Sequence, residues 1–160
     1  MKKLLLTSLM LAAIIETTLA GSLEEKVQQL CADVAPRQIS LSDAIQMIRD
    51  DGYTIKKVKS DRARIKINGK TLMLYRYDDG DYQLYYGTTG VKITYEDINY
   101  WNYHKRLARA YLDGKKDPVL ESDLDAGGGL TKAQLLNFIK VFSNVSVPSF
   151  VQFLLKRDKS

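Results

Sequence analysis

The chain has 160 residues, of which 45% are hydrophobic and 27% are charged, and its formal net charge at pH 7 is +5. Basic and acidic residues are interspersed, so charge alone does not indicate binding to nucleic acid or to a membrane. The single cysteine excludes an internal disulfide, and the single histidine excludes a zinc site built from several histidines.

The N-terminus has the pattern of a secretory signal peptide. Met1–Lys3 is positively charged, residues 4–15 form an uncharged and mostly apolar run, and Thr18-Leu19-Ala20 offers a cleavage site. The run is too short to span a membrane, which needs about 20 apolar residues. We expect residues 1–20 to be removed, leaving a periplasmic or secreted protein with no stable membrane span.

Residues 21–39 are predicted to be a segment that leads into the domain. Pro36 ends any helix that begins at Leu23. Cys31 lies in this segment, before the folded core, and we expect it to be exposed. An exposed lone thiol outside the cytoplasm can bridge two chains.

The first half of the domain reads as one helix and a meander of strands. Residues 41–51 have apolar side chains at helical spacing, with a capping pattern at Ser40 and Asp43 and a stop at Gly52. Alternating residues and turn signals, among them Asn68-Gly69, then predict antiparallel strands. Their predicted ranges are 53–58, 63–67, 71–77 and 82–86.

The second half is predicted to contain a helix, two strands and a C-terminal helical region. A helix starts at Thr94 and ends indistinctly, because residues 106–112 alternate as a strand; a second strand covers 119–124. Thr131 with Gln134 caps the last region, which residues 144–149 should interrupt. The sequence therefore predicts a single α+β domain over residues 40–157, with helices packed on an antiparallel sheet in the order α-β-β-β-(β)-α-β-β-α.

A row of carboxylates in the last strand is the best candidate for catalysis. Glu121, Asp123 and Asp125 share one face by the period of two. Paired carboxylates can perform acid–base hydrolysis when their environments separate their pKa values. Cross-strand pairing with Arg106 and Arg109 explains the same row as structure, so we expect no catalytic residue here.

Other polar motifs also have structural explanations. Asp78, Asp79 and Asp81 surround Gly80, a composition typical of tight turns that lacks the later glutamate of a calcium-binding loop. The glycines at 127–129 lack the Gly-Lys-Ser/Thr ending of a phosphate-binding loop. We expect neither a metal site nor a cofactor.

Five tyrosines lie on the predicted strands and suggest an aromatic sheet surface. They are Tyr75, Tyr77, Tyr82, Tyr85 and Tyr86. Such rings can stack on bases, but the mixed charge and the export signal argue against nucleic acid. A protein interface, or a half-buried sheet, explains them better.

One stretch resembles a known family. It contains a Trp-Asn pair followed by basic residues (101–106), an Ala-Tyr-Leu-Asp strand (110–113), an Asp-Pro turn (117–118) and an acidic strand leading to glycines (119–129). With the order of elements around it, this resembles the YbjN family over residues 33–157. The resemblance implies an α+β domain similar to type III secretion chaperones and a role in regulating bacterial sensory transduction. It carries no established catalytic residues.

Together these observations predict a non-catalytic protein-binding or regulatory module of the bacterial cell envelope. We expect a protein partner or a homodimer, because Leu135–Leu155 has more large apolar residues than one buried stripe needs. The alternatives are a small hydrolase using Glu121 and Asp123, and a sensor of a ligand or metal. The candidate structural or interface residues are Trp101, Asn102, Arg106, Arg109, Tyr111, Glu121, Asp123, Phe150 and Phe153.

Overall fold

The computed structural model describes residues 21–31 and 35–159. The chain divides into two units, Met1–Ala35 and Pro36–Ser160. In the first unit, residues 21–31 are helical, and Cys31 is exposed, as expected. The predicted signal peptide lies outside the described residues and stays a prediction.

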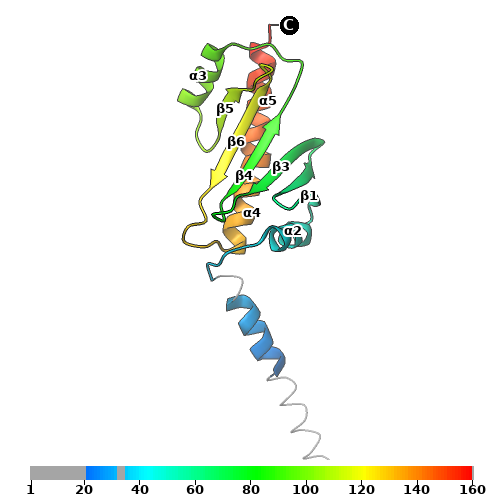
Figure 1. Ribbon diagram of the computed structural model, residues 1–160. Coiled ribbons are helices and arrows are strands. Elements are labelled where there is room, and N and C mark those ends of the chain that lie inside the picture. The colour runs from blue at the N-terminus through cyan, green and yellow to red at the C-terminus, as the bar shows by residue number, and fades with distance from the viewer. Residues whose placement is uncertain (1–20, 32–34, 160) are drawn as a thin grey trace, which may run out of the picture. The chain divides into compact units, whose positions relative to one another are not determined.

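The second unit contains four α-helices, a π-helical segment and six strands (Figure 1). They are α2 (Leu41–Asp50), β1 (Thr54–Lys59), β2 (Arg62–Ile67), β3 (Lys70–Arg76), β4 (Tyr82–Gly87), α3 (Tyr95–His104), β5 (Arg109–Leu112), β6 (Pro118–Leu124), α4 (Lys132–Val141), η1 (Phe142–Ser146) and α5 (Val147–Arg157).

Local sequence signals place most of these elements. The Ser40 side chain accepts a hydrogen bond from the Asp43 backbone at the start of α2. Thr94 and Thr131 form complete capping boxes at α3 and α4, which satisfy backbone donors that a helix start leaves free. Asn68 and Gly69 both have positive φ, the backbone of a two-residue hairpin.

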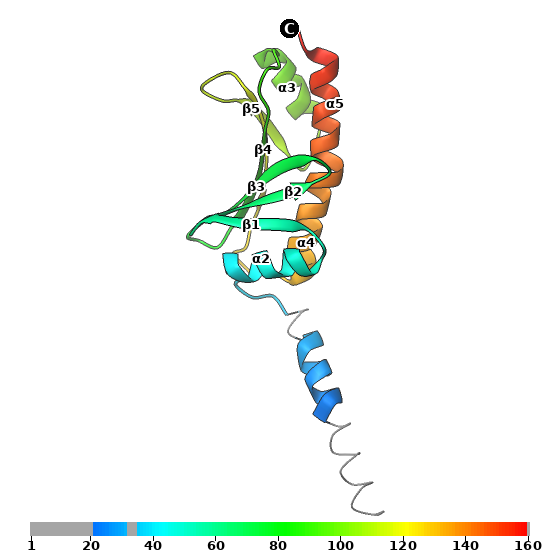
Figure 2. The ribbon, with the colours of Figure 1, turned by 90° about the vertical axis from the view of Figure 1, so that its right-hand side faces the viewer.

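All six strands pair antiparallel in the order β1-β2-β3-β4-β6-β5. The helices α2, α4 and α5 lie on one side of this sheet (Figure 2). Between that side and the helices lies one apolar core, whose largest fully buried side chains include Tyr82, Leu84, Leu120, Ile139, Phe142 and Phe150. The predicted α+β class, with helices packed on an antiparallel sheet, is confirmed.

The C-terminal helix is continuous, and the predicted interruption at 144–149 is wrong. Pro148 has no N–H to donate to the preceding turn, and the wider π turn of η1 directly before it carries the helix past this position. By length and composition alone, Lys132–Arg157 could also cross a membrane. In this fold its apolar side chains are partly used in the core, where Leu135, Ile139 and Leu154 are buried.

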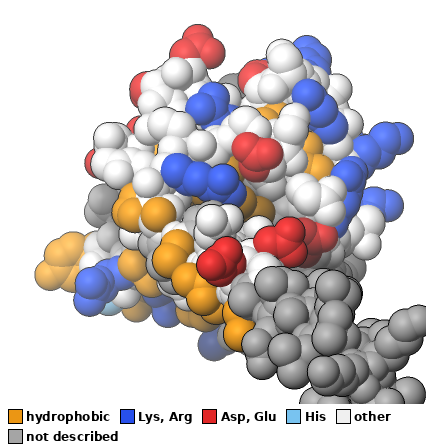
Figure 3. All heavy atoms as spheres, turned by 90° about the horizontal axis from the view of Figure 1, so that it is seen from below, with side chains coloured by type: hydrophobic (Ala, Val, Ile, Leu, Met, Phe, Trp, Pro, Cys, Tyr) orange, Lys and Arg blue, Asp and Glu red, His pale blue; other side chains and the backbone are white. Residues whose placement is uncertain are grey.

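The strand predicted at 106–112 begins only at Arg109. Leu107 has a φ of 72°, in the left-handed region that an extended strand cannot contain. Arg106 therefore lies on the connection before β5, with an exposed side chain. On the surface, basic and acidic side chains are interspersed, and hydrophobic ones gather on one side of the view from below (Figure 3).

Candidate functional site

The sheet has a second face on which no helix of the described unit packs (Figure 2). Cross-strand register places its residues in rows that run from β2 to β5. We call this surface the open face. It carries Tyr75, Tyr77, Gln83, Tyr85, Arg109, Tyr111, Glu121 and Asp123. Tyr82 and Tyr86, predicted to share a face with the other tyrosines, have the opposite strand parity and belong to the core side.

Glu121 is the centre of a hydrogen-bonded network on the open face. Its side chain is only 10% exposed, and Arg109 donates to Oε2 from Nη2 at 3.2 Å. The Tyr111 hydroxyl donates to Oε1 at 2.5 Å. Both carboxylate oxygens are therefore occupied by side chains of the same chain, which is the arrangement of a structural ion pair.

Asp123 extends this network toward β4. Arg109 Nη2 lies 3.6 Å from Asp123 Oδ2, and Gln83 donates to Oδ1 at 2.8 Å. The Tyr77 hydroxyl in turn donates to Gln83 at 3.0 Å. The predicted pairing with Arg109 is confirmed for Glu121 and Asp123, whereas Asp125 Oδ1 instead accepts the Gly127 N–H at 2.7 Å. For Arg106 the predicted pairing is wrong, because this residue precedes β5 and makes none of the ion pairs within the described ranges.

The electrostatics of the network keep its two donors, Tyr111 and Arg109, protonated. Burial and then the hydrogen bond to Glu121 raise the pKa of Tyr111, so its hydroxyl stays protonated and donates. The hydrogen bond to Glu121 raises the pKa of Arg109, followed by the nearby charge of Asp123. The carboxylate thus faces two fixed donors across the ordinary pH range.

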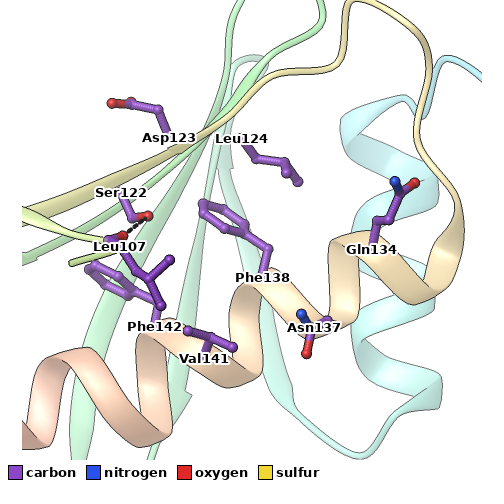
Figure 4. A pocket seen from close by; sticks show the side chains of 9 residues that line it. All are labelled: Leu107, Ser122, Asp123, Leu124, Gln134, Asn137, Phe138, Val141 and Phe142. Atoms are coloured by element: carbon purple, nitrogen blue, oxygen red, sulfur yellow. Dashed lines mark hydrogen bonds between the residues drawn. The ribbon is translucent and has the colours of Figure 1, made fainter.

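A groove of about 410 Å³ lies between β6 and the C-terminal helix (Figure 4). We call it the α4–β6 groove. Its helical wall uses positions three and four apart, which share one face of a helix. Its lining residues are Leu107, Ser122, Asp123, Leu124, Gln134, Asn137, Phe138, Val141 and Phe142. Leu124 and Phe138 face each other across the groove, while Asp123 points away from it (Figure 4).

The groove borders an unpaired stretch of strand edge. β5 pairs with β6 only as far as Arg109 opposite Glu121. The chain turns away at Leu107, whose carbonyl accepts a hydrogen bond from Ser122 Oγ at 2.6 Å. Asp123 and Leu124 therefore have β4 on one side and no described strand on the other, and an unpaired edge can accept another strand.

The remaining candidate residues hold α3 in place. Trp101 is 2% exposed, and its ring lies 5.0 Å from Phe150 and 5.4 Å from Phe153 between centroids. The Asn102 amide accepts from the Ala110 backbone N–H at 2.8 Å and donates to the Ala110 carbonyl at 3.0 Å. These contacts join α3 to α5 and β5, and Phe150, which is fully buried, is a core residue.

Sequence reasoning missed the groove. One face of the helix carries Gln134, Asn137, Phe138 and Val141. Whether this face stays uncovered depends on the residue at which β5 begins, which the sequence did not predict. The aspartates at 78–81 act as turn residues, since Asp79 Oδ1 accepts the Asp81 N–H and Asp81 Oδ1 accepts the Ala126 N–H. Within the described ranges, no group of three potential metal ligands is found.

Comparisons with known proteins address the family and the fold. Residues 49–150 match the YbjN family, described as "Putative bacterial sensory transduction regulator". The crystal structure of YbjN from E. coli, titled "a putative transcription regulator", has a TM-score of 0.55 and 15% identity, covering 66% of this chain and 84% of that one.

A second solved structure is the Yersinia pestis type III secretion chaperone SycH in complex with a stable fragment of YscM2. It has a TM-score of 0.48 and 16% identity, covering 64% of this chain and 92% of that one. No curated protein matches the sequence. The family match extends over more than half of the sequence, and the chain belongs to the YbjN family.

Proposed function

We propose that this protein is a non-catalytic regulatory module of the bacterial cell envelope that binds an extended apolar segment of a partner protein in the α4–β6 groove. One observation carries the proposal: an apolar groove lies directly beside an edge of β6 that pairs with no described strand. The signal-peptide pattern of residues 1–20 supports the envelope location.

The physical chemistry of strand addition fits this edge. An incoming extended segment gains main-chain hydrogen bonds from the free edge, and alternate side chains enter a neighbouring pocket. Here the pocket walls are Phe138, Val141 and Leu124, and the volume of about 410 Å³ lies within the usual range for ligand sites. The exposed Leu107 at the rim adds apolar area that water otherwise covers.

The alternative of a hydrolase has less support. A catalytic carboxylate needs a free oxygen that can reach a substrate or a water. Glu121 has Tyr111 on one oxygen and Arg109 on the other, and Asp123 is held by Gln83 and Arg109. This network explains the acidic row as a device that fixes β5, β6 and β4 to one another.

The proposal is tested with peptides selected on the mature protein from a random library. We expect selected peptides to contain alternating apolar residues and to shift the amide NMR signals of residues 122–124 and 134–141. Leu107→Glu combined with Asn137→Glu places charge on exposed positions of the groove. This variant should weaken peptide binding at least about tenfold, a difference of about 1.4 kcal/mol.

Leu155→Glu is the matched control, because Leu155 is 75% exposed on α5 and does not line the groove. It should bind the peptides as the wild type does. Peptide binding that survives both groove charges would refute the site. If no peptide binds and the groove variant instead converts a dimer to a monomer, the groove holds a second copy of the chain and the partner-segment proposal fails.

A further inference from the structure

A second cavity, of about 400 Å³, lies between α3 and α5 and is unlike the α4–β6 groove. We call it the α3–α5 cleft. Positions 149, 152, 153 and 156 form one face of α5, since they are spaced three and four residues apart. Its lining residues are Tyr100, His104, Lys105, Ser149, Gln152, Phe153 and Lys156.

The cleft has an aromatic wall. The rings of Tyr100 and Phe153 are parallel within 4°, with centroids 6.4 Å apart. His104 stacks on Tyr100 at 4.0 Å between centroids, and its Nδ1 lies 2.8 Å from the Tyr100 carbonyl oxygen. Behind Phe153, the buried Trp101 fixes the wall from the core side. A flat ring entering the cleft therefore meets a surface that is already ordered.

The charge on the cleft is of one sign. Lys105 and Lys156 both line it, and no carboxylate does. Neither lysine forms an ion pair with a carboxylate in the described part of the chain. Lys105 Nζ lies 5.7 Å from the Trp101 ring centroid, a contact that leaves its charge without a carboxylate partner. Arg157 is neutralised, because its Nη1 contacts Asp97 Oδ1 at 3.0 Å, and its guanidinium lies 4.6 Å from the Tyr100 ring centroid. Two unpaired ammonium groups beside an aromatic wall attract an anion.

We propose that the α3–α5 cleft binds a small anion that carries a flat aromatic ring, such as an aromatic phosphate or carboxylate. The ring packs against Phe153 and the edge of Tyr100, because His104 and Arg157 lie over the faces of the Tyr100 ring. The anionic group is held by Lys105 and Lys156. The Ser149 hydroxyl and the Gln152 amide supply further hydrogen-bonding groups in the lining. A cavity of this volume is large enough for such a molecule.

The test uses phenyl phosphate, which carries both features, with inorganic phosphate and phenol as probes of each feature alone. Binding is followed by amide NMR titration of the mature protein. We expect saturable shifts at residues 100–105 and 149–156 with phenyl phosphate. Each single-feature probe should bind at least about tenfold more weakly, since a charge-assisted hydrogen bond and a buried ring each contribute on that scale.

Lys105→Gln combined with Lys156→Gln should weaken phenyl phosphate binding at least about tenfold, because it removes two charge-assisted contacts. Lys56→Gln with Lys57→Gln is the matched control, since it removes the same charge from exposed positions on β1, at the other end of the sheet. Equal binding of inorganic phosphate and phenyl phosphate would overturn the proposal. So would unsaturated shifts spread over lysines elsewhere, or an equal effect of both lysine pairs.

Discussion

The two faces of the sheet are built from the same strands by opposite physical means. On the core side, Leu84, Leu120 and their neighbours are covered by helices, so burial of apolar area stabilises that side. On the open face, Glu121 has almost the same burial as many core residues but is surrounded by polar partners. Leu120 and Glu121 are adjacent in the sequence, but Leu120 stabilises the fold by burying apolar area and Glu121 by accepting hydrogen bonds.

The comparison shows that burial alone does not identify a core. Glu121 loses most of its water, and the cost is offset only because Arg109 and Tyr111 occupy its oxygens. Removing a residue from the core side leaves a cavity, whereas removing one from the open face leaves partners without an acceptor or donor. The two faces should therefore respond to substitution with different magnitudes and different pH dependence.

The largest expected effect is on the core side, at Trp101. Trp101→Ala should lower the free energy of unfolding by about 3–5 kcal/mol, because it leaves a cavity against Phe150 and Phe153. Urea unfolding followed by circular dichroism measures this change. Trp101→Phe is the control and should retain most of the stability, since no hydrogen bond to the indole N–H is found among the described groups. A loss below about 1 kcal/mol in the alanine variant would place Trp101 outside the core.

A smaller effect is expected at the centre of the open face. Glu121→Gln keeps the shape of the side chain but removes the negative charge that Arg109 and Tyr111 both contact. It should lower the free energy of unfolding by about 1–3 kcal/mol. Tyr111→Phe removes one donor alone and should cost less. If Glu121→Gln leaves the stability unchanged but abolishes partner binding, the carboxylate has a direct function and the structural interpretation of the network is wrong.

A capping carboxylate at α3 gives a pH-dependent effect of intermediate size. The Thr94 backbone N–H lowers the pKa of Asp97, which also accepts from the Thr94 hydroxyl and pairs with Arg157. Because the folded pKa is depressed, this stabilisation is present above the ordinary pKa of about 4 and is lost as pH falls through the folded value. Asp97→Asn should therefore cost about 1 kcal/mol at pH 7.

Urea unfolding of the wild type and Asp97→Asn at a series of pH values tests this expectation. The difference between the two proteins should shrink as the pH falls below about 4, where the wild-type carboxylate gains its proton. Asp43→Asn, at the start of α2, is the comparison, because the Asp43 carboxylate accepts from the Ser40 hydroxyl but forms no ion pair with a described arginine. A difference at Asp97 that stays constant down to pH 2 would show that charge is not its source.

The sequence predicted those features that depend on neighbouring residues. The caps at Ser40, Thr94 and Thr131, and the turn at Asn68-Gly69, each follow from two to four adjacent side chains. The π turn before Pro148 was not predicted, because a proline inside an apolar run is compatible either with a break or with a wider turn. Packing of the continuous helix against the sheet decides between them.

The candidate sites show the same division. The pairing of Arg109 with Glu121 follows from strand alternation, but the residue at which β5 begins does not. β5 starts three residues later than predicted, because the chain turns at Leu107 before it. That shift removes Arg106 from the strand and leaves the end of β6 with no described strand on the side away from β4. The α4–β6 groove and the α3–α5 cleft both combine residues far apart in the sequence, so spacing along the chain could not reveal them.

The smallest expected effect separates the two arginines that the sequence treated alike. Arg109→Gln removes the partner of Glu121 and Asp123, but its side chain is 63% exposed, so water screens much of the attraction and the cost should be about 0.5–1 kcal/mol. Arg106→Gln removes the same charge from a position that forms no ion pair with any described residue, and it should leave the free energy of unfolding unchanged within error. Raising the salt concentration to about 1 M should reduce the Arg109 effect, since the Debye length then falls to about 3 Å. Equal losses of unfolding free energy in the two variants would mean that Arg106 also reaches the acidic row in solution, and that β5 begins before Arg109.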